Sequence, residues 1–414
     1  MKASAGRTLM LVDKPYPNDT RVRNEAETLS DAGYSVMVVC LRKEGQPYQE
    51  VINGVRTYRL PALELFRKTP KENLTFLYRA WVKAKSFFGY VGEYVYFTGG
   101  CFFMSIYLAL TRGFDAIHAH NPPDTLWLVA LPWKLLGKKY VFDHHDVCPE
   151  LYRSRYDAEY DFFARMLKVL EWVNLRFANI TIATNESYKE IAIHRGSRRP
   201  NTVFVVRNGP NPSRMQIPAP SARLRAMNKC ILVYVGSLNP QDGVDYLIRS
   251  LGHLFHELKR DDFHCVIIGT GDSLQDLRSL ADHVKLDGHL EFTGYISDEE
   301  LQQNLAAADI CMDPDPASPL NNLSTWIKVM EYMAYGKAIV SFDLPETRYS
   351  ARDAALYVPP NDEKAFARAT AQLMDDPALR EKMGRSGRER VEKELQWSVV
   401  SRNLLAAYAA LKLA

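Results

Sequence analysis

Strand-like and helix-like runs alternate along nearly the whole chain, and this alternation is the feature that most limits its fold. Short apolar runs such as TLMLV (8–12) and SVMVVC (35–40) are each followed by a helical pattern, which is typical of parallel sheets covered by helices. A proline-rich stretch at 207–225 interrupts the pattern, which restarts at 230–237 with CILVYVGS. The sequence therefore predicts two tandem doubly wound, Rossmann-like α/β domains, 1–207 and 208–396, with a C-terminal helix at about 397–414 that packs back on the first.

Length, charge and cysteine spacing narrow the class of protein. A chain of 414 residues exceeds what one hydrophobic core usually supports. The formal net charge of +3 is too small to indicate a nucleic-acid-binding protein. Six cysteines without C-x-x-C or zinc-like spacing predict reduced, mostly buried thiols. The N-terminal apolar run is too short for a signal peptide, which favours a cytoplasmic location.

The region 66–111 combines basic and aromatic residues with a long apolar run. Residues 94–111 carry no charge and reach the lower length limit of a membrane span, although a glycine pair interrupts them. Upstream, lysines and arginines alternate with aromatic residues, a pattern suited to anionic lipid. A buried helix, docking on the membrane surface and a true span all remain open, and the first two are compatible. We expect a peripheral protein on the inner face of the plasma membrane.

The stretch STWIKVMEYMAYG (324–336) predicts a helix with an unusual order of charges. Ser324 and Thr325 are good N-cap residues, and Gly336 stands where a glycine commonly ends a helix. Lys328 then falls in the first turn, where a cation opposes the helix dipole by about 0.3–1 kcal/mol unless an anion is bound there. The order predicts a phosphate beside Lys328 and a ribose whose hydroxyl groups bind Glu331. A surface pair of Lys328 and Glu331 is the alternative.

Glycines follow three of the predicted strands in the second half. Gly236 ends VYVGS, Gly269 and Gly271 lie in VIIGTGD, and Gly294 lies in FTGY. A structural turn would explain any one of them. The carboxyl ends of parallel strands share one edge of a sheet. Glycines at that edge, together with a helix whose first turn favours an anion, indicate a nucleotide diphosphate site.

The order and spacing of longer motifs resemble the GT4 family of retaining glycosyltransferases, which have the GT-B fold. In the second half these motifs are VRNGPN (206–211), YVGSLNPQDGVDYLI (234–248), IIGTGD (267–272), FTGYIS (292–297), LAAADICMDP (305–314) and STWIKVMEYMAYGKAIVSFDLPETR (324–348). In the first half HAHNPPD (118–124) and FDHHDVCPELY (142–152) resemble a bacterial branch that builds O-antigens and other surface polysaccharides. The resemblance covers almost the whole chain. It implies transfer of a hexosyl or N-acetylhexosaminyl group, with retention, from a nucleotide diphosphate sugar to a lipid-linked or polysaccharide acceptor.

Residues at matching motif positions take the roles that this resemblance implies. Glu331 matches a glutamate that holds the ribose, Lys328 a lysine near the diphosphate, and His120 a histidine beside the reacting sugar; these three form the catalytic set. The donor-binding candidates are Arg207, Asn208, Gly209, Gly236, Gly269, Gly271, Tyr295, Ser324 and Thr325. The acceptor-side candidates are Asp19, Arg21, His144, His145 and Asp146. His118 shares a strand face with His120, so one of the two could be structural.

Three departures from the family pattern bear on phosphate binding. Leu323 stands where the first glutamate of an E-x7-E motif is expected, Ser237 and Asp242 replace a basic pair, and YPNDTRVRNEA (16–26) replaces a glycine-rich loop. The expected substitutes are Arg207, Arg21, Lys328 and helix amides. Without compensation, two lost charged contacts of about 1.5–3 kcal/mol each would severely weaken donor binding.

We expect no metal site and no metal requirement, with a UDP-sugar favoured over a GDP-sugar as donor. DPDP (313–316) resembles a D-x-D metal motif, but its prolines favour a turn. Adjacent residues of DHHD (143–146) alternate faces of a strand and rarely converge on one ion. Two other functions remain open: a nucleotide-sugar epimerase of the same fold, and a catalytically weakened binding or scaffold protein.

Overall fold

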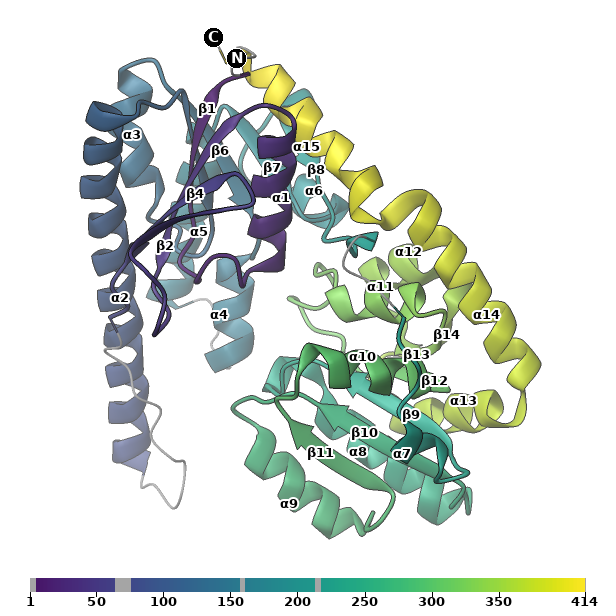
Figure 1. Ribbon diagram of the computed structural model, residues 1–414. Coiled ribbons are helices and arrows are strands. Elements are labelled where there is room, and N and C mark those ends of the chain that lie inside the picture. Colours follow the sequence, from purple (N-terminus) through teal and green to yellow (C-terminus); the bar gives the residue numbers. More distant parts are fainter. Residues whose placement is uncertain (1–4, 64–75, 157–160, 213–216, 414) are drawn as a thin grey trace. The chain divides into compact units, whose positions relative to one another are not determined.

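The computed structural model describes residues 5–63, 76–156, 161–212 and 217–413 (Figure 1). The chain divides into two compact units. The first unit consists of Met1–Pro149, Tyr160–Val206 and Ser401–Ala414, and the second of Glu150–Glu159 and Arg207–Val400. The chain thus leaves the first unit at Val206, beside the predicted boundary at 207, and returns to it within the C-terminal helix.

The first unit is built on an eight-stranded sheet in the order β3-β4-β2-β1-β5-β6-β7-β8. The pair β3–β4 is antiparallel and the other pairs are parallel. The strands are β1 (Arg7–Leu11), β2 (Ser35–Leu41), β3 (Gln49–Ile52), β4 (Val55–Leu60), β5 (Ala116–His120), β6 (Lys139–His144), β7 (Ile180–Ala183) and β8 (Val203–Val205). All the first-half strands expected from the sequence are present, and the short β3, joined to β4 by the Asn53-Gly54 turn, is an addition to them.

Helices cover both faces of this sheet. They are α1 (Thr20–Asp31), α2 (Phe76–Thr111), α3 (Trp127–Leu135), α5 (Phe162–Phe177), α6 (Glu186–His194) and the end of α15 (Trp397–Leu411), with a 3-10 turn η1 (Pro200–Thr202). Most of α4 (Cys148–Tyr156) belongs to the second unit. Figure 1 shows α2 on the opposite side of the sheet from α1 and α15. Contacts place α3 between α2 and α5.

The second unit has a six-stranded, wholly parallel sheet in the order β11-β10-β9-β12-β13-β14. Its strands are β9 (Cys230–Val235), β10 (Phe263–Ile268), β11 (Leu290–Gly294), β12 (Ile310–Asp313), β13 (Ala338–Phe342) and β14 (Ala355–Val358). Its helices are α7 (Ala222–Arg225), α8 (Val244–Gly252), α9 (Leu274–Val284), α10 (Asp298–Ala307), α11 (Ile327–Ala334), α12 (Pro345–Ala351), α13 (Glu363–Asp375) and α14 (Pro377–Arg390). Short 3-10 and π turns are η3 (Pro240–Asp242), η4 (His253–Glu257), η5 (Arg352–Ala354) and η6 (Val391–Leu395). The two doubly wound patterns predicted from the sequence are confirmed.

Both faces of the second sheet are buried, as expected for parallel strands covered by helices. Alternate residues of β9 enter two different cores: Leu232 and Tyr234 belong to one, and Ile231 and Val233 to the other. The six cysteines are unpaired, and four of them are fully buried, which agrees with the thiols expected from the sequence. Both sheets therefore present their carboxyl-terminal edges as the places where polar side chains gather.

Helix α2 is partly core and partly surface. Val91–Thr111 is long and apolar enough to cross a membrane by length and composition, and 28% of that window is buried. Phe97, Cys101 and Leu108 lie against the unit, whereas Phe103 and Leu110 on the same helix are 72% and 84% exposed. The apolar run at 94–111 thus contributes both to the core and to an exposed surface. The basic and aromatic residues at 66–75 lie outside the described residues.

Candidate active site

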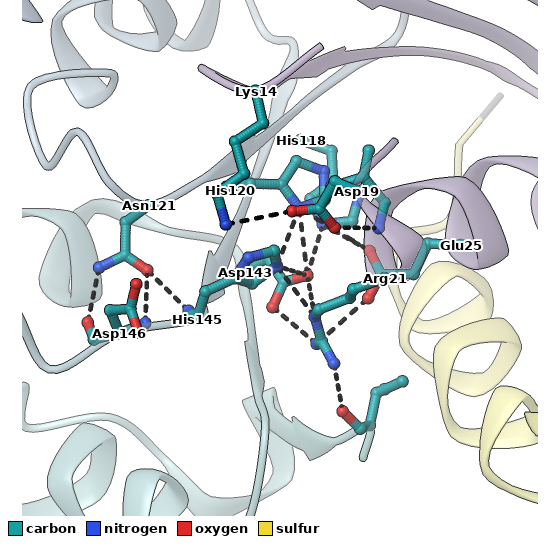
Figure 2. A network of polar contacts seen from close by, with 12 residues as sticks. Lys14, Asp19, Arg21, Glu25, His118, His120, Asn121, Asp143, His145 and Asp146 are labelled. Carbon is teal, nitrogen blue, oxygen red and sulfur yellow. Dashed lines mark hydrogen bonds and ion pairs between the residues drawn. The ribbon is translucent and has the colours of Figure 1, made fainter. Parts of the chain in front are cut away.

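Two histidines and two carboxylates meet at the carboxyl end of the first sheet (Figure 2). His118 and His120 come from β5, Asp143 comes from β6, and Glu25 comes from α1, the helix that follows β1. All four are at most 1% exposed. They converge because β1, β5 and β6 are parallel neighbours, and the strand register pairs His120 with Asp143. We call these four residues the histidine–carboxylate cluster.

Asp143 is the centre of the surrounding network. Its Oδ2 lies 3.0 Å from His145 Nε2, 3.3 Å from His120 Nδ1 and 3.7 Å from His118 Nε2. Arg21 contacts both carboxylate oxygens, with Nη2 at 2.8 Å from Oδ1 and Nε at 3.2 Å from Oδ2. Burial alone would raise the pKa of Asp143, but Arg21 and the neighbouring imidazoles of His145, His118 and His120 together hold it well below its usual range. Asp143 is therefore ionised at neutral pH.

Arg21 joins three separate parts of the first unit. Besides Asp143, its Nη2 lies 3.1 Å from Glu25 Oε1, one turn further along α1. Its Nη1 donates a 2.6 Å hydrogen bond to the carbonyl of Val206, just after β8. Arg21 itself is 5% exposed. Arg21 was predicted on the acceptor side. In the structure it is buried within the network around Asp143.

The two cluster histidines lie against each other. Their rings stack with centroids 4.3 Å apart. His118 Nδ1 lies 3.0 Å from the hydroxyl of Tyr408 on α15, which also lies 3.1 Å from Thr8 Oγ1. Burial lowers the pKa of His120 to about 3, so its imidazole is neutral. His118 therefore has a structural partner, and His120 is held by Asp143 and, at 3.2 Å, by His145 Nε2.

Other predicted acceptor-side residues line the same edge. Asp19 caps α1 by accepting a 3.1 Å hydrogen bond from the amide of Val22, and Lys14 lies 3.4 Å from its other oxygen. Asn121, after β5, accepts hydrogen bonds from the amides of His145 and Asp146 at 2.6 and 3.3 Å. Asn121 thereby ties the loop after β6 to the loop after β5 (Figure 2).

His144 does not belong to this group, which corrects its placement among the acceptor-side candidates. Neighbouring residues of a strand point to opposite faces, and His144 is fully buried on the face away from the cluster. There its Nε2 lies 3.1 Å from Glu171 Oε1 on α5, and Arg195 lies 2.5 Å from the other oxygen of Glu171. His144 therefore anchors α5 to the sheet.

Replacing Glu171 with glutamine should lower the stability of the protein in a pH-dependent way. Burial alone would raise the pKa of Glu171, but the hydrogen bond from His144 and the charge of Arg195 hold it below its usual value. The carboxylate therefore adds stability above the pKa of the unfolded chain, and this is lost as pH falls through the lower folded pKa. We expect Glu171→Gln to cost about 1–2 kcal/mol at pH 7, since a charged hydrogen bond becomes neutral.

Urea unfolding of wild type and Glu171→Gln between pH 7 and pH 3 measures this difference. It should shrink towards zero as the carboxylate of the folded wild type is protonated. Glu186→Gln, at an exposed position on α6, serves as the control. A difference that stays constant with pH would show that the charge of Glu171 is not responsible.

In the second unit, the helix that carries Lys328 and Glu331 begins later than predicted. The sequence predicted N-caps at Ser324 and Thr325, but α11 begins at Ile327. Ser324 donates its hydroxyl to the carbonyl of Leu320 at 2.9 Å, and Thr325 donates to Glu346 at 3.1 Å. Each hydroxyl thus donates to an acceptor outside α11. Neither caps the helix.

The anion expected beside Lys328 is supplied by the chain itself. Lys328 Nζ lies 2.5 Å from Asp315 Oδ2 and 3.5 Å from Asp313 Oδ1, and both aspartates are fully buried. Burial alone would lower the pKa of Lys328, but the charges of Asp315 and Asp313 outweigh it and raise the pKa. The DPDP segment is therefore more than the simple turn that the sequence predicted. It holds the counter-ions of a buried lysine.

Glu331 differs from Lys328 in having no such partner. Its carboxylate makes no hydrogen bond or ion pair with any residue in the part of the chain that the structure describes. It is half-buried, and burial raises its pKa. A carboxylate held in this way near the surface is ready to accept hydrogen bonds from a ligand.

Arg207 is also paired. Both of its terminal nitrogens lie within 3.2 Å of Glu346 Oε2, and its Nη1 lies 3.3 Å from Thr325 Oγ1. Its guanidinium stacks over the ring of Tyr349, 4.1 Å from the centroid. As a substitute for the missing basic pair, Arg207 would have to share its charge between Glu346 and a phosphate.

The predicted donor-binding glycines permit close backbone packing. A Cβ on Gly269 would lie 1.8 Å from the carbonyl oxygen of Gly236, and one on Gly271 would lie 2.3 Å from that of Leu238. A Cβ on Gly209 would lie 1.7 Å from the carbonyl oxygen of Leu395. The structural need for these glycines is thus sufficient to explain them.

The remaining positions divide between surface and interior. The predicted donor-side Tyr295 is 88% exposed directly after β11, and Asn208 is half-buried. Among the departures, Ser237 is exposed, whereas Asp242 is buried and accepts a 3.0 Å hydrogen bond from the amide of Asn239. Asp242 therefore closes a capping box before α8.

The sequence did not single out Glu25, Asp313, Asp315 or Glu346 as site residues. Glu25 could have been found because it lies four residues after Arg21 on a helix that follows a buried strand. Asp313 and Asp315 were assigned to a turn because their partner is a lysine thirteen or more residues later, and only the fold brings the two together. Glu346 pairs with Arg207 across an even longer separation.

Family comparisons cover most of the chain. The family described as "Glycosyl transferase 4-like domain" matches residues 19–209, and the one described as "Glycosyl transferases group 1" matches residues 229–376. The chain belongs to the GT4 family of glycosyltransferases. This glycosyltransferase is 29% identical over 203 residues to a phosphatidyl-myo-inositol mannosyltransferase from Mycobacterium leprae, which is 49% of this chain and 52% of that protein.

Further relatives extend the comparison. A GDP-mannose-dependent monoacylated alpha-(1-6)-phosphatidylinositol monomannoside mannosyltransferase from Corynebacterium glutamicum is 30% identical over 172 residues, covering 40% of this chain and 44% of its own. The matches thus span about half the length of these curated relatives.

Solved structures place the fold in the GT-B class. The sucrose-phosphate synthase of Thermosynechococcus elongatus has a TM-score of 0.74 at 20% identity, over 98% of this glycosyltransferase and 99% of that chain. HepE from Anabaena, in complex with UDP and glucose, has a TM-score of 0.71 at 12% identity over 98% and 100% of the two chains. At these identities the likeness concerns the fold.

Proposed function

We propose that this glycosyltransferase moves a hexosyl or N-acetylhexosaminyl group, with retention, from a UDP-sugar to a lipid-linked or polysaccharide acceptor at the cytoplasmic membrane face. The observation that carries the donor part is the carboxylate of Glu331 on α11, which has no partner among the described residues. The first-half motifs suggest the branch that builds O-antigens and related polysaccharides.

The donor would bind at the edge where α11 follows β12. Glu331 would accept two hydroxyl hydrogen bonds from the ribose, and the free amides at the start of α11 would face the diphosphate. Lys328 and Arg207 would contribute charge only in part, because Asp313, Asp315 and Glu346 already neutralise them. The helix amides would therefore have to replace most of what the basic pair, absent at Ser237 and Asp242, would contribute. Preorganised charges and amides would supply the main stabilisation of the leaving diphosphate.

The chemistry we propose needs neither a covalent nucleophile nor a metal at the diphosphate. A phosphate oxygen of the donor would help to deprotonate the incoming hydroxyl group on the same face of the sugar. His120, neutral and held by Asp143, would orient the reacting sugar, while Asp19, His145 and Asp146 would contact the acceptor. Retention can be checked by the anomeric configuration of the product.

Replacing Glu331 with alanine should weaken nucleotide binding. Calorimetric titration of the wild type with UDP should show micromolar binding, tighter than with GDP, and Glu331→Ala should lose about 1.5–3 kcal/mol, or roughly 10- to 150-fold. GDP belongs in the experiment because the relative from Corynebacterium glutamicum is named as GDP-mannose-dependent. Glu300→Ala, an exposed glutamate on α10, is the matched control and should bind like the wild type.

The other two functions give different results in the same assays. Conversion of a free nucleotide sugar into its epimer, without acceptor, would favour the epimerase. If well-folded wild type bound neither nucleotide, the enzyme proposal would be abandoned for a scaffold role. Slow hydrolysis of the donor without acceptor agrees with a transferase.

We further propose that the first unit docks on anionic membrane through a continuous face of α2, α3 and α5. Its exposed apolar residues are Val95, Phe103, Tyr107, Leu110, Leu128, Leu135, Leu136, Phe162, Val169 and Trp172. The three helices are neighbours, and α3 and α5 also carry Lys134, Arg165, Lys168 and Arg176. An apolar surface with basic residues is the pattern of a helix lying on anionic lipid.

A double change in this face should release the protein from vesicles. Leu135 and Leu136 are 80% and 71% exposed, so Leu135→Ser/Leu136→Ser should leave folding intact. Loss of two inserted side chains should weaken binding to phosphatidylglycerol vesicles at least about 10-fold. Ile217→Ser, at an exposed apolar position of the second unit, is the control. Equal sedimentation of all three proteins with vesicles would contradict the proposed face.

A further inference from the structure

The histidine–carboxylate cluster has the composition and spacing of a metal site. One donor atom from each of Glu25, His118, His120 and Asp143 lies within 4.8 Å of the others. The cluster draws on two strands and one helix that are distant in sequence, and it is almost completely removed from solvent. The proposal below does not depend on the glycosyl transfer reaction.

The donor atoms are spaced as ligands of one ion. His118 Nε2 lies 3.8 Å from Glu25 Oε2 and 3.7 Å from Asp143 Oδ2. His120 Nδ1 lies 3.9 Å from Glu25 Oε2 and 3.3 Å from Asp143 Oδ2. Ligands arranged tetrahedrally at bond lengths of about 2.0–2.2 Å are about 3.4 Å apart. A small inward movement of the side chains would therefore complete the coordination.

Two of the four donor atoms, His118 Nε2 and Glu25 Oε2, are buried and form no hydrogen bond within the part of the chain that the structure describes. The other two already contact His145, whose Nε2 lies 3.2 Å from His120 Nδ1 and 3.0 Å from Asp143 Oδ2. A buried polar atom without a partner is costly, and a coordinated ion would remove that cost. Arg21 Nη2 lies 3.1 Å from Glu25 Oε1 and 2.8 Å from Asp143 Oδ1, and its Nε lies 3.2 Å from Asp143 Oδ2. It thus holds both carboxylates in place beside the imidazoles.

The charge balance of this edge also favours a cation. Five carboxyl groups and two basic groups influence one another there, so the carboxyl groups outnumber the basic groups by three. These groups are Asp13, Asp19, Glu25, Asp143, Asp146, Lys14 and Arg21. Arg21 alone does not compensate Glu25, Asp143 and Asp19 together.

We propose that Glu25, His118, His120 and Asp143 bind one divalent transition-metal ion of the zinc class. Two imidazole nitrogens with two carboxylate oxygens suit zinc, whereas magnesium and calcium prefer oxygen alone. The ion would join β5, β6 and α1 and fix the ring of His120 through Nδ1. Its role would be structural, so it does not conflict with a transfer reaction that uses no metal at the diphosphate.

Metal analysis of the full chain tests the proposal. After expression with zinc and dialysis against a chelator, the wild type should retain one zinc ion per chain, because buried ligands release metal slowly. His118→Ala and Glu25→Ala should each retain none. His194→Ala, which removes an exposed histidine on α6, should retain as much as the wild type. Absence of zinc from the wild type, before and after loading with zinc, would overturn the proposal.

Spectroscopy of the wild type keeps the test independent of how the variants fold. X-ray absorption at the zinc edge should show nitrogen and oxygen ligands at about 2.0–2.2 Å, including imidazole, and no sulfur. The melting temperature of the wild type should rise with the logarithm of free zinc concentration. Sulfur ligands, or a melting temperature that zinc does not change, would show that any retained metal is held elsewhere. A cluster that holds a proton in place of the ion would give these negative results.

Discussion

Lys328→Ala is expected to lower the free energy of unfolding of the glycosyltransferase by about 3–5 kcal/mol. The change leaves Asp313 and Asp315 fully buried without the ammonium group that neutralises them. Removing one partner of a buried ion pair is costly because the other partner remains desolvated. Urea unfolding with an unchanged slope measures the loss, and Lys382→Ala, an exposed lysine on α14, should change stability little.

A second variant separates stability from donor binding. In Lys328→Met with Asp315→Asn, the uncompensated charge is reduced, so part of the lost stability should return. If Lys328 also touches the diphosphate, UDP binding should stay weak in this variant although the fold has recovered. Wild-type affinity would restrict Lys328 to a structural role. A stability loss below about 1 kcal/mol for Lys328→Ala would contradict the ion pair itself.

Arg21→Ala is expected to be equally damaging, at about 3–5 kcal/mol. It removes the guanidinium that contacts Asp143, Glu25 and the carbonyl of Val206. Arg21→Lys should recover little of the loss, because an ammonium group cannot reproduce the bidentate contact with Asp143. Chemical unfolding gives the magnitude, and hydrogen exchange of β6 amides shows whether the loss centres on the network. Arg56→Ala, at an exposed site on β4, is the matched control.

An Arg21→Lys protein as stable as the wild type would mean that charge alone, without the geometry of the guanidinium, holds the network. Equal losses for Arg21→Ala and Arg56→Ala would place Arg21 outside it altogether. Both measurements concern stability and are independent of the acceptor.

The architecture could be read from the sequence because it follows from local pattern. Strands such as β9 and β10 are short apolar runs bounded by glycine and polar residues, and these signals are contained within a few neighbouring residues. β3 was missed although the Asn53-Gly54 pair that joins it to β4 is a strong hairpin signal, and both residues have positive φ in the structure. The four residues of β3 are too few to show a clear alternation of apolar and polar side chains. The start of α11 was misplaced for a different reason. The hydroxyl of Thr325 donates to the distant Glu346, and this contact competed with the capping role.

The site was accessible to sequence reasoning only in part. His120, Arg21 and Glu331 lie at strand ends or helix faces, so their positions follow from the fold class. The identity of the groups that neutralise them does not follow from the fold class, because these partners come from other elements. His144 shows the limit at the scale of one residue: next to Asp143 in sequence, it faces the opposite layer. Both side chains are fully buried, so the alternation of faces along β6 separates them, and the partner of each comes from a different layer.

The contact between His118 and Tyr408 has a consequence for how the protein is made. Tyr408 on α15 contacts Thr8 on β1 and His118 on β5, although the whole second unit lies between these strands and α15 in the sequence. The first unit therefore stays incomplete during synthesis until the second unit has been translated. A chain that stopped before Tyr408 would leave His118 and Thr8 without this contact.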